Sequence, residues 1–239
     1  MSGSVHEECS VAQPWKTIET IETVDGPLEL RQRGERDFLI MINGRVLMNS
    51  TTNRSEIVLG ELAAQKVAMR PKPRVLVGGL GMGLTLKAVL DALPTEAEVV
   101  VAEFNPAVAR WCRGPLADLT LRAVEDPRVT VIVDDVAYLI KQAAETKAGQ
   151  FDAIIIDLYE GPHAKTDAMN DPFYGSRALK TTSDALTTGG IFAIWGENPD
   201  EAFEKRLTTA GFTIDRQRPG RGGLRHVVYV AQKSNYSGG

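Results

Sequence analysis

From Pro73 onward, short runs rich in valine and isoleucine alternate with segments whose apolar residues have helical spacing. The runs are RVLVGG, EVVVAEF, RVTVIVDD, FDAIIIDLY, GIFAIWGE, FTIDRQ and LRHVVYVAQ. Helices are expected between them at residues 84–92, 106–118, 136–145, 171–186 and 199–209. Nearly continuous apolar strands that alternate with helices indicate an α/β protein with a parallel sheet covered on both faces, because such strands have no polar side to turn toward water.

The end of the chain narrows this fold class further. The last two runs are separated by residues 219–223, PGRGG, and by no helix, which predicts an antiparallel hairpin at the end of the sheet. A seven-stranded, mostly parallel sheet with such a hairpin is the Rossmann-like sheet of transferases that use S-adenosylmethionine (SAM). It differs from a plain dinucleotide-binding sheet, which has no terminal hairpin of this kind.

The residues before the main sheet predict a small antiparallel β domain. Short β-type runs between residues 15 and 49 are broken by turn residues, and Asn43-Gly44 is a strong hairpin signal. From Ser55 the pattern becomes helical, with six apolar residues on or near one face: Ile57, Leu59, Leu62, Ala63, Val67 and Met69. We therefore expect a disordered N-terminus at 1–14, a β-hairpin domain at 15–53, a catalytic domain at 54–233 and a tail at 234–239.

Composition limits the classes of partner. The 239 residues carry a formal net charge of −4 without long charged blocks, so there is no basic surface for nucleic acid or an anionic membrane. Two cysteines, Cys9 and Cys112, and three histidines form neither a disulfide framework nor a metal-ligand set. No signal peptide or apolar stretch of about 18 residues is present, which favours a cytoplasmic protein with a small-molecule substrate.

A glycine-rich turn follows the first run of the main domain. Gly79, Gly81 and Gly83 form a GxGxG pattern, in which the missing Cβ atoms let the backbone curl around a ligand before a helix begins. The dinucleotide fingerprint would place its third glycine one position later, at Leu84. The spacing therefore favours a nucleoside over a pyrophosphate.

Acids follow the next three runs. Glu103 can accept hydrogen bonds from the two ribose hydroxyls, or it is an exposed acid at a strand end, and Phe104 can lie against adenine. Asp134 and Asp135 can accept the adenine amino proton or cap the next helix; the two readings are equal for Asp134, and the ligand reading is favoured for Asp135. Asp157 reaches the carboxyl edge, where open α/β sheets bind ligands, or it merely caps a loop.

Several segments resemble the spermidine synthase, or polyamine aminopropyltransferase, family. They are VLVGGLGMGLTLKAVL, VVVAEFNPAVARWC, DPRVTVIVDDVAYLI, FDAIIIDLYEGP and PFYGSRALKTTSDALTTGGIFAI, within roughly residues 38–210. The resemblance implies that Glu103 holds the ribose, Asp135 the adenine amino group, and that Asp157 is the base that takes a proton from an attacking amine. It places Glu160 where the family has a second Asp that holds the amine. It allows a homodimer without specifying one.

The sequence departs from that family's pattern in three places. Met82 replaces the family's Asp that grips the donor's amino group, and residues 157–161, DLYEG, replace its Asp-Ser/Thr-x-Asp-Pro loop. Residues 59–61, LGE, replace its Tyr-His-Glu, so that only Glu61 is kept. Tyr159 can face a sulfonium, since aromatic faces attract cations. These changes favour intact SAM over decarboxylated SAM as the donor, with no metal.

The leading functional reading is a SAM-dependent transferase that alkylates a small amine or an amino-acid-type substrate. The alternatives are an aminopropyltransferase that uses decarboxylated SAM, a cyclase that releases methylthioadenosine from SAM, and a nicotinamide oxidoreductase. The last alternative is a relative that binds a nucleoside without catalysing a reaction. Four further side chains have open roles: Trp195 walls a pocket or closes the core, Tyr174 most simply packs, and His163 and His226 most simply lie in solvated loops.

Overall fold

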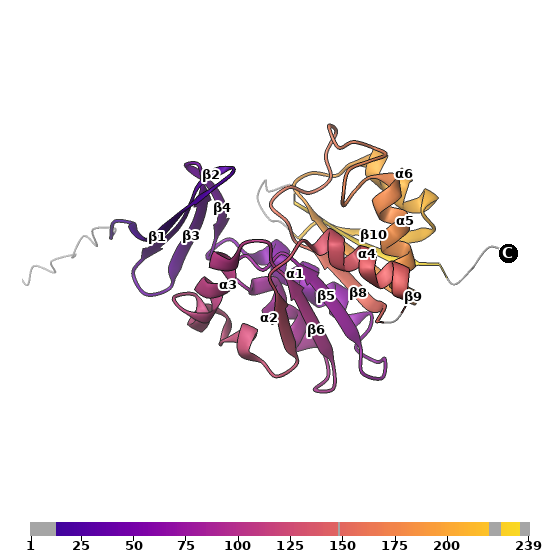
Figure 1. The fold of residues 1–239 in the computed structure, drawn as a ribbon, viewed down its shortest axis with the longest axis horizontal. Coiled ribbons are helices and arrows are strands. Elements are labelled where there is room, and N and C mark those ends of the chain that lie inside the picture. Colours follow the sequence, from indigo (N-terminus) through magenta and orange to yellow (C-terminus); the bar gives the residue numbers. More distant parts are fainter. Residues whose placement is uncertain (1–12, 148, 220–225, 235–239) are drawn as a thin grey trace, which may run out of the picture. The chain divides into compact units, whose positions relative to one another are not determined.

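The computed structural model describes residues 13–147, 149–219 and 226–234 (Figure 1). The chain divides into two compact units, one ending at Thr52 and one beginning at Asn53. Most of the predicted N-terminal segment 1–14 and tail 234–239 lies outside the described residues, as do Cys9 and residues 220–225 of the predicted hairpin turn. Among the described residues, no helix has both the length and the apolar character needed to cross a bilayer.

The N-terminal unit is a four-stranded antiparallel sheet in the order β1-β2-β3-β4. Its strands are β1 (Lys16–Thr23), β2 (Gly26–Arg33), β3 (Asp37–Ile42) and β4 (Arg45–Asn49). The β3–β4 turn contains Asn43 at φ 46° and Gly44 at φ 77°, the two positive φ values that a tight hairpin turn requires. The predicted small β domain is confirmed as a separate antiparallel sheet.

The main unit contains a seven-stranded sheet in the order β10-β11-β9-β8-β5-β6-β7 (Figure 1). Its strands are β5 (Arg74–Gly78), β6 (Glu98–Ala102), β7 (Val129–Ile132), β8 (Phe151–Ile156), β9 (Leu186–Gly196), β10 (Phe212–Gln217) and β11 (Val227–Lys233). The first five in sequence pair in parallel, and β11 is antiparallel to both β9 and β10. The predicted α/β fold with a terminal hairpin is confirmed.

Helices cover both faces of this sheet. They are α1 (Arg54–Gln65), α2 (Leu84–Ala92), α3 (Pro106–Arg113), α4 (Val136–Thr146), α5 (Ser176–Ala185) and α6 (Glu201–Thr209), with short 3₁₀ turns η1 (Ala117–Thr120) and η2 (Ala123–Glu125). The crossovers from β5 to β7 and from β7 to β9 run in opposite directions, so right-handed connections place α2 and α4 on opposite faces. Helix α1 packs against α2, β8, β9 and β11, while α4, α5 and α6 share one apolar cluster with β8 and β9.

Three helix boundaries differ from the predictions by more than two residues. Helix α1 ends at Gln65, so Met69, predicted on its apolar face, is 96% exposed in the turns that lead to Pro71 and Pro73. Helix α3 ends at Arg113 rather than at 118, because Gly114 is followed by a proline, which disfavours helical backbone at the residue before it.

The third difference lengthens the loop after β8. Helix α5 begins at Ser176, whereas a start at Asp171 was predicted. Asp171 instead caps a separate turn: its Oδ1 accepts the backbone N–H groups of Phe173 at 2.9 Å and Tyr174 at 2.7 Å. A Cβ at Gly175 would lie 2.7 Å from the Asp171 nitrogen, so this turn is tight. The loop between β8 and α5 therefore runs from 157 to 175.

Candidate functional site

The candidate site lies where the connections of the main sheet diverge. Strand β5 lies between β8 and β6. The chain continues from β5 to β6 and β7 on one side, and then crosses to β8 on the other side. In open α/β sheets this divergence leaves a crevice at the carboxyl ends of the strands, where ligands bind. The glycine turn and the predicted acids all follow strands at this edge.

Gly79 allows the turn after β5 to pass against the end of β8. Its φ is +91°, and a Cβ placed on it would lie 2.3 Å from the carbonyl oxygen of Asp157. Gly81 and Gly83 also have positive φ, at 51° and 79°. Gly83 is the N-cap of α2 and has no side chain to bind the first N–H groups of that helix, which leaves them to an oxygen of a ligand.

Met82 belongs to the core of the main unit. Its side chain has no exposed surface. A buried thioether fills apolar space and cannot reach a ligand in the crevice. The structure thus places no exposed surface of Met82 at the crevice, and its role in cofactor binding stays a prediction.

Glu103 is buried and ties the glycine turn to the end of β6. Its Oε2 accepts the Leu80 N–H at 2.9 Å and its Oε1 accepts the Asn105 N–H at 2.8 Å. Burial raises the pKa of Glu103 above its ordinary value, and these backbone donors oppose the rise. At 8% exposure, Glu103 is not the solvated strand-end acid of the alternative reading. Each carboxylate oxygen has more than one acceptor site, so hydroxyl groups of a ribose can still bind.

The residues after β6 and β7 offer a surface for a base. Phe104 is 76% exposed beside the buried Glu103. Asp135 caps α4, with its Oδ1 accepting the Ala137 N–H at 2.9 Å, and Asp134 accepts the Asp135 N–H at 2.8 Å. Asp135 therefore has the capping role, which the sequence analysis considered less favoured than ligand binding. The capping hydrogen bond uses one of its two carboxylate oxygens.

Asp157 follows β8 and is held by the helix after the glycine turn. Its Oδ2 accepts a 2.5 Å hydrogen bond from Thr85 Oγ1 on α2. Burial raises the pKa of Asp157 to about 7; the Thr85 hydrogen bond opposes the rise, and the Glu56 carboxylate adds to it. A carboxyl group with a pKa near neutrality can both take up and release a proton, as a general base must.

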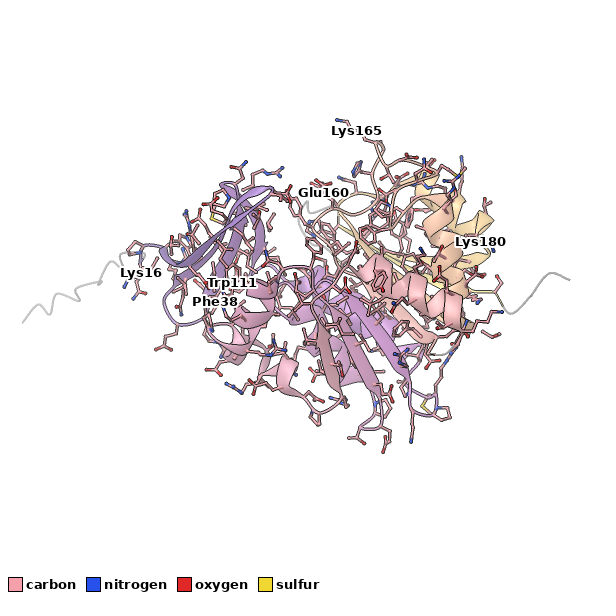
Figure 2. All side chains as sticks on the ribbon, in the orientation of Figure 1. Lys16, Phe38, Trp111, Glu160, Lys165 and Lys180 are labelled. Atoms are coloured by element: carbon pink, nitrogen blue, oxygen red, sulfur yellow. The ribbon has the colours of Figure 1, made fainter. Side chains whose placement is uncertain are left out.

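The rest of the loop is anchored through Tyr174. This side chain is 3% exposed, packs edge-on against Phe203 at 5.7 Å, and donates from its hydroxyl to the Glu160 carbonyl oxygen at 2.9 Å. Glu160 is exposed, as Figure 2 shows, and Tyr159 is exposed as well. His163 is also exposed, and its Nδ1 accepts the backbone N–H of Lys165, which Figure 2 shows at the outer tip of the loop.

Comparison with known protein families shows to which family this chain belongs. A model of the spermine/spermidine synthase domain matches residues 60–208. The chain belongs to this family. The same residues contain the glycine turn, the buried Glu103 and Asp157 described above.

Two curated relatives illustrate how far the similarity to spermidine synthase-type proteins extends. A polyamine aminopropyltransferase of Mycobacterium tuberculosis is 31% identical over 59% of this chain and 27% of its own length. Polyamine aminopropyltransferase 1 of Hyperthermus butylicus is 32% identical over 66% of this chain and 54% of its own length. The chain thus spans between about a quarter and about half of the length of these relatives.

A solved structure shows the same fold. The crystal structure of spermidine synthase from Thermotoga maritima superimposes with a TM-score of 0.70 at 17% identity, covering 92% of this chain and 74% of that one. At this identity the match concerns the arrangement of strands and helices. It agrees with the sheet order and the separate N-terminal sheet described above.

Sequence reasoning missed the acid that lies beside Asp157. The family pattern pointed to Glu61, which is exposed on α1. Glu56, in the first turn of the same helix, is the acid that acts on Asp157, and Thr85 Oγ1 lies 3.3 Å from the Glu56 carbonyl oxygen. The sequence signal was weak: Glu56 is one acid in a first helical turn, a position that acids occupy for local reasons.

Proposed function

We propose that this chain transfers an aminopropyl group from decarboxylated SAM to a small amine. The observation that carries this proposal is Asp157 at the end of β8, with a pKa of about 7, against the turn of Gly79 in a spermine/spermidine synthase domain. The names of the relatives favour this reading over the intact-SAM transferase that the loss of the family's Asp at Met82 suggested.

The charges of the site support a cationic donor. Glu56, Glu103, Asp157 and Glu160 give this edge of the sheet several carboxylates. Both donors carry an amine on the arm attached to sulfur, but only intact SAM also carries a carboxylate there. Like charges in a partly buried site repel, so these side chains disfavour that carboxylate. Decarboxylated SAM and a protonated amine acceptor both match the negative potential, whereas the carboxylate of intact SAM does not.

The proposed reaction assigns one role to each group. Glu103 holds the ribose hydroxyls, and the exposed ring of Phe104 together with Asp135 faces the adenine. The acceptor nitrogen attacks the carbon that joins the aminopropyl arm to sulfur, the C–S bond breaks, and methylthioadenosine leaves. Asp157 takes the proton that the new N–C bond releases. Tyr159 and Glu160 border the acceptor from the loop.

The nucleoside product identifies the reaction. The protein is incubated with decarboxylated SAM and short amines, and with SAM in parallel, and the products are measured by mass spectrometry. We expect methylthioadenosine and an amine that is heavier by one aminopropyl group, with decarboxylated SAM only. S-adenosylhomocysteine from SAM would establish methyl transfer instead, and binding without any product would establish a nucleoside-binding protein.

Thr85 is predicted to tune the base. Thr85→Val removes the hydrogen bond that stabilises ionised Asp157, so the pKa of Asp157 rises and a smaller fraction is ionised at pH 7. We expect the acid limb of the pH–rate profile to move to higher pH and the rate at pH 7 to fall about two- to tenfold, the value of one hydrogen bond. Thr85→Ser should keep the wild-type profile.

A second buried threonine provides the control for this prediction. Thr182 on α5 is 2% exposed and belongs to the other face of the sheet. Thr182→Val should leave the pH–rate profile in place even if it changes stability. Equal profiles for wild type and Thr85→Val would contradict the proposed link between Thr85 and the base.

A further inference from the structure

Three side chains near the carboxyl edge of the sheet point to the same face. Ile156 of β8 pairs with Ile194 of β9, and Gly196 of β9 pairs with Val227 of β11. Ile156, Ile194 and Val227 all belong to the apolar cluster beneath α4, α5 and α6. Because successive residues of a strand point to opposite faces, the residues next to them point toward the other face, which α1 covers. These neighbours are Asp157, Trp195 and His226.

The first turn of α1 orients the His226 ring. Ser55 is buried, its Oγ donates to Glu56 Oε2 at 2.7 Å, and the same Oγ lies 3.2 Å from His226 Nδ1. A serine hydroxyl has one hydrogen, and the carboxylate takes it because an ionised carboxylate only accepts. With the serine hydrogen directed to Glu56 Oε2, the tautomer that completes the contact carries its hydrogen on His226 Nδ1 and donates it to Ser55.

This assignment leaves the other ring nitrogen as an acceptor. When a neutral imidazole has its hydrogen on Nδ1, its Nε2 presents a lone pair. The ring of Trp195 stands edge-on to His226, with centroids 5.0 Å apart and planes at 72°, and both side chains are half-buried. The imidazole is thus held by a hydrogen bond on one side and an aromatic edge on another, which fixes the direction of Nε2.

We propose that His226 binds the second nitrogen of a diamine acceptor whose first nitrogen meets Asp157. Neighbouring strands lie about 4.8 Å apart, and each residue advances about 3.3 Å along a strand. Trp195 pairs with Val228, so His226 is displaced by two residues along β11, and the Cα atoms of Asp157 and His226 are separated by about 12 Å across β8, β9 and β11. A hydrogen bond at each end leaves room for a chain of a few methylene groups, with Trp195 between the ends. The inference rests on the proposed aminopropyl transfer and adds the residue that selects diamines over monoamines.

The test compares 1,4-diaminobutane with 1-aminobutane, which have the same carbon chain. In His226→Phe we expect KM for the diamine to rise about 10- to 100-fold, the value of a hydrogen bond to a charged group, with kcat little changed. The KM for the monoamine should stay the same, because it has no second nitrogen. Ser55→Ala should move the diamine KM in the same direction by a smaller factor, and Ser55→Thr should restore it.

His163→Phe is the matched control, since His163 is an exposed histidine of the loop. It should leave both values of KM unchanged. An equal rise for diamine and monoamine in His226→Phe would give His226 a structural role only and overturn the inference.

Calorimetry separates this inference from the proposed function. Binding of 1,4-diaminobutane is measured in the presence of methylthioadenosine, without turnover. Weaker diamine binding in His226→Phe than in wild type supports the inference whichever group is transferred. Equal binding, or no diamine binding to wild type, overturns it. Aminopropyl transfer to the monoamine at the same rate as to the diamine overturns it too, while the proposed function stands.

Discussion

Asp157→Asn is expected to lower turnover by about 10² to 10⁴, the usual contribution of a general base. Asparagine has nearly the same shape, and its amide oxygen can keep the hydrogen bond from Thr85, but it cannot take a proton from the attacking amine. Release of methylthioadenosine from decarboxylated SAM and an amine is the measurement. Asp184→Asn, at the exposed end of α5, should keep wild-type turnover.

A stability measurement shows that lost turnover is not lost folding. The folded-state pKa of Asp157 is raised from 3.8 to about 7, so the buried acid favours folding while it is protonated. That contribution is complete below pH 3.8 and is lost as the pH rises through about 7. Such a shift corresponds to at most about 4 kcal/mol, which water around the half-buried group reduces to about 1 to 3 kcal/mol.

The asparagine variant should therefore be more stable than wild type at pH 8, and its advantage should shrink toward pH 5. Urea denaturation at the two pH values gives the free energies of unfolding. A variant that keeps wild-type turnover would show that Asp157 is not the base. If the difference in the free energy of unfolding between the variant and wild type is the same at pH 5 and pH 8, the carboxyl group is well hydrated in the folded protein.

Gly79→Ala is expected to cost about 3 kcal/mol of stability, from left-handed backbone and a steric clash together, and to remove nucleoside binding. Left-handed backbone costs an alanine about 1 to 2 kcal/mol. The new Cβ would also lie 2.3 Å from the carbonyl oxygen of Asp157, a backbone atom that cannot turn away, so the glycine turn and the end of β8 must separate. Urea denaturation and calorimetric titration with methylthioadenosine measure the two effects.

Comparison with Gly211→Ala separates the backbone cost from the cost of the clash. Gly211 has a φ of +89°, close to the +91° of Gly79, but a Cβ there would have nothing within 4 Å. Only the backbone cost of about 1 to 2 kcal/mol should appear, with nucleoside binding intact. Equal losses of stability in the two variants would mean that the close approach between Gly79 and Asp157 does not constrain the fold.

Local patterns predicted the strands and the ends at which the site lies. The runs around Leu76 and Ile155 are apolar throughout, and both residues are fully buried, because a strand covered on two faces needs no polar side. The glycine turn could be read in the same way, since its positive φ values leave a mark in the residue types themselves. The helix expected to begin at Asp171 begins at Ser176, because Asp171 caps a separate turn, and a capping residue shows where a turn begins and not how long it continues.

The sequence by itself determined the order of the elements, the curl after β5 and an acid at the end of each neighbouring strand. Only the tertiary structure decided which side chains meet Asp157. Thr85 and Glu56 act on Asp157 from α2 and α1, and His226 is held near the same turn of α1 through Ser55. These residues are far apart in the chain and come together because α1 packs on α2 and on β8, β9 and β11. Hydrophobic periodicity and capping patterns depend on residues that are close in the sequence. Contacts between residues far apart in the chain depend instead on how whole helices pack.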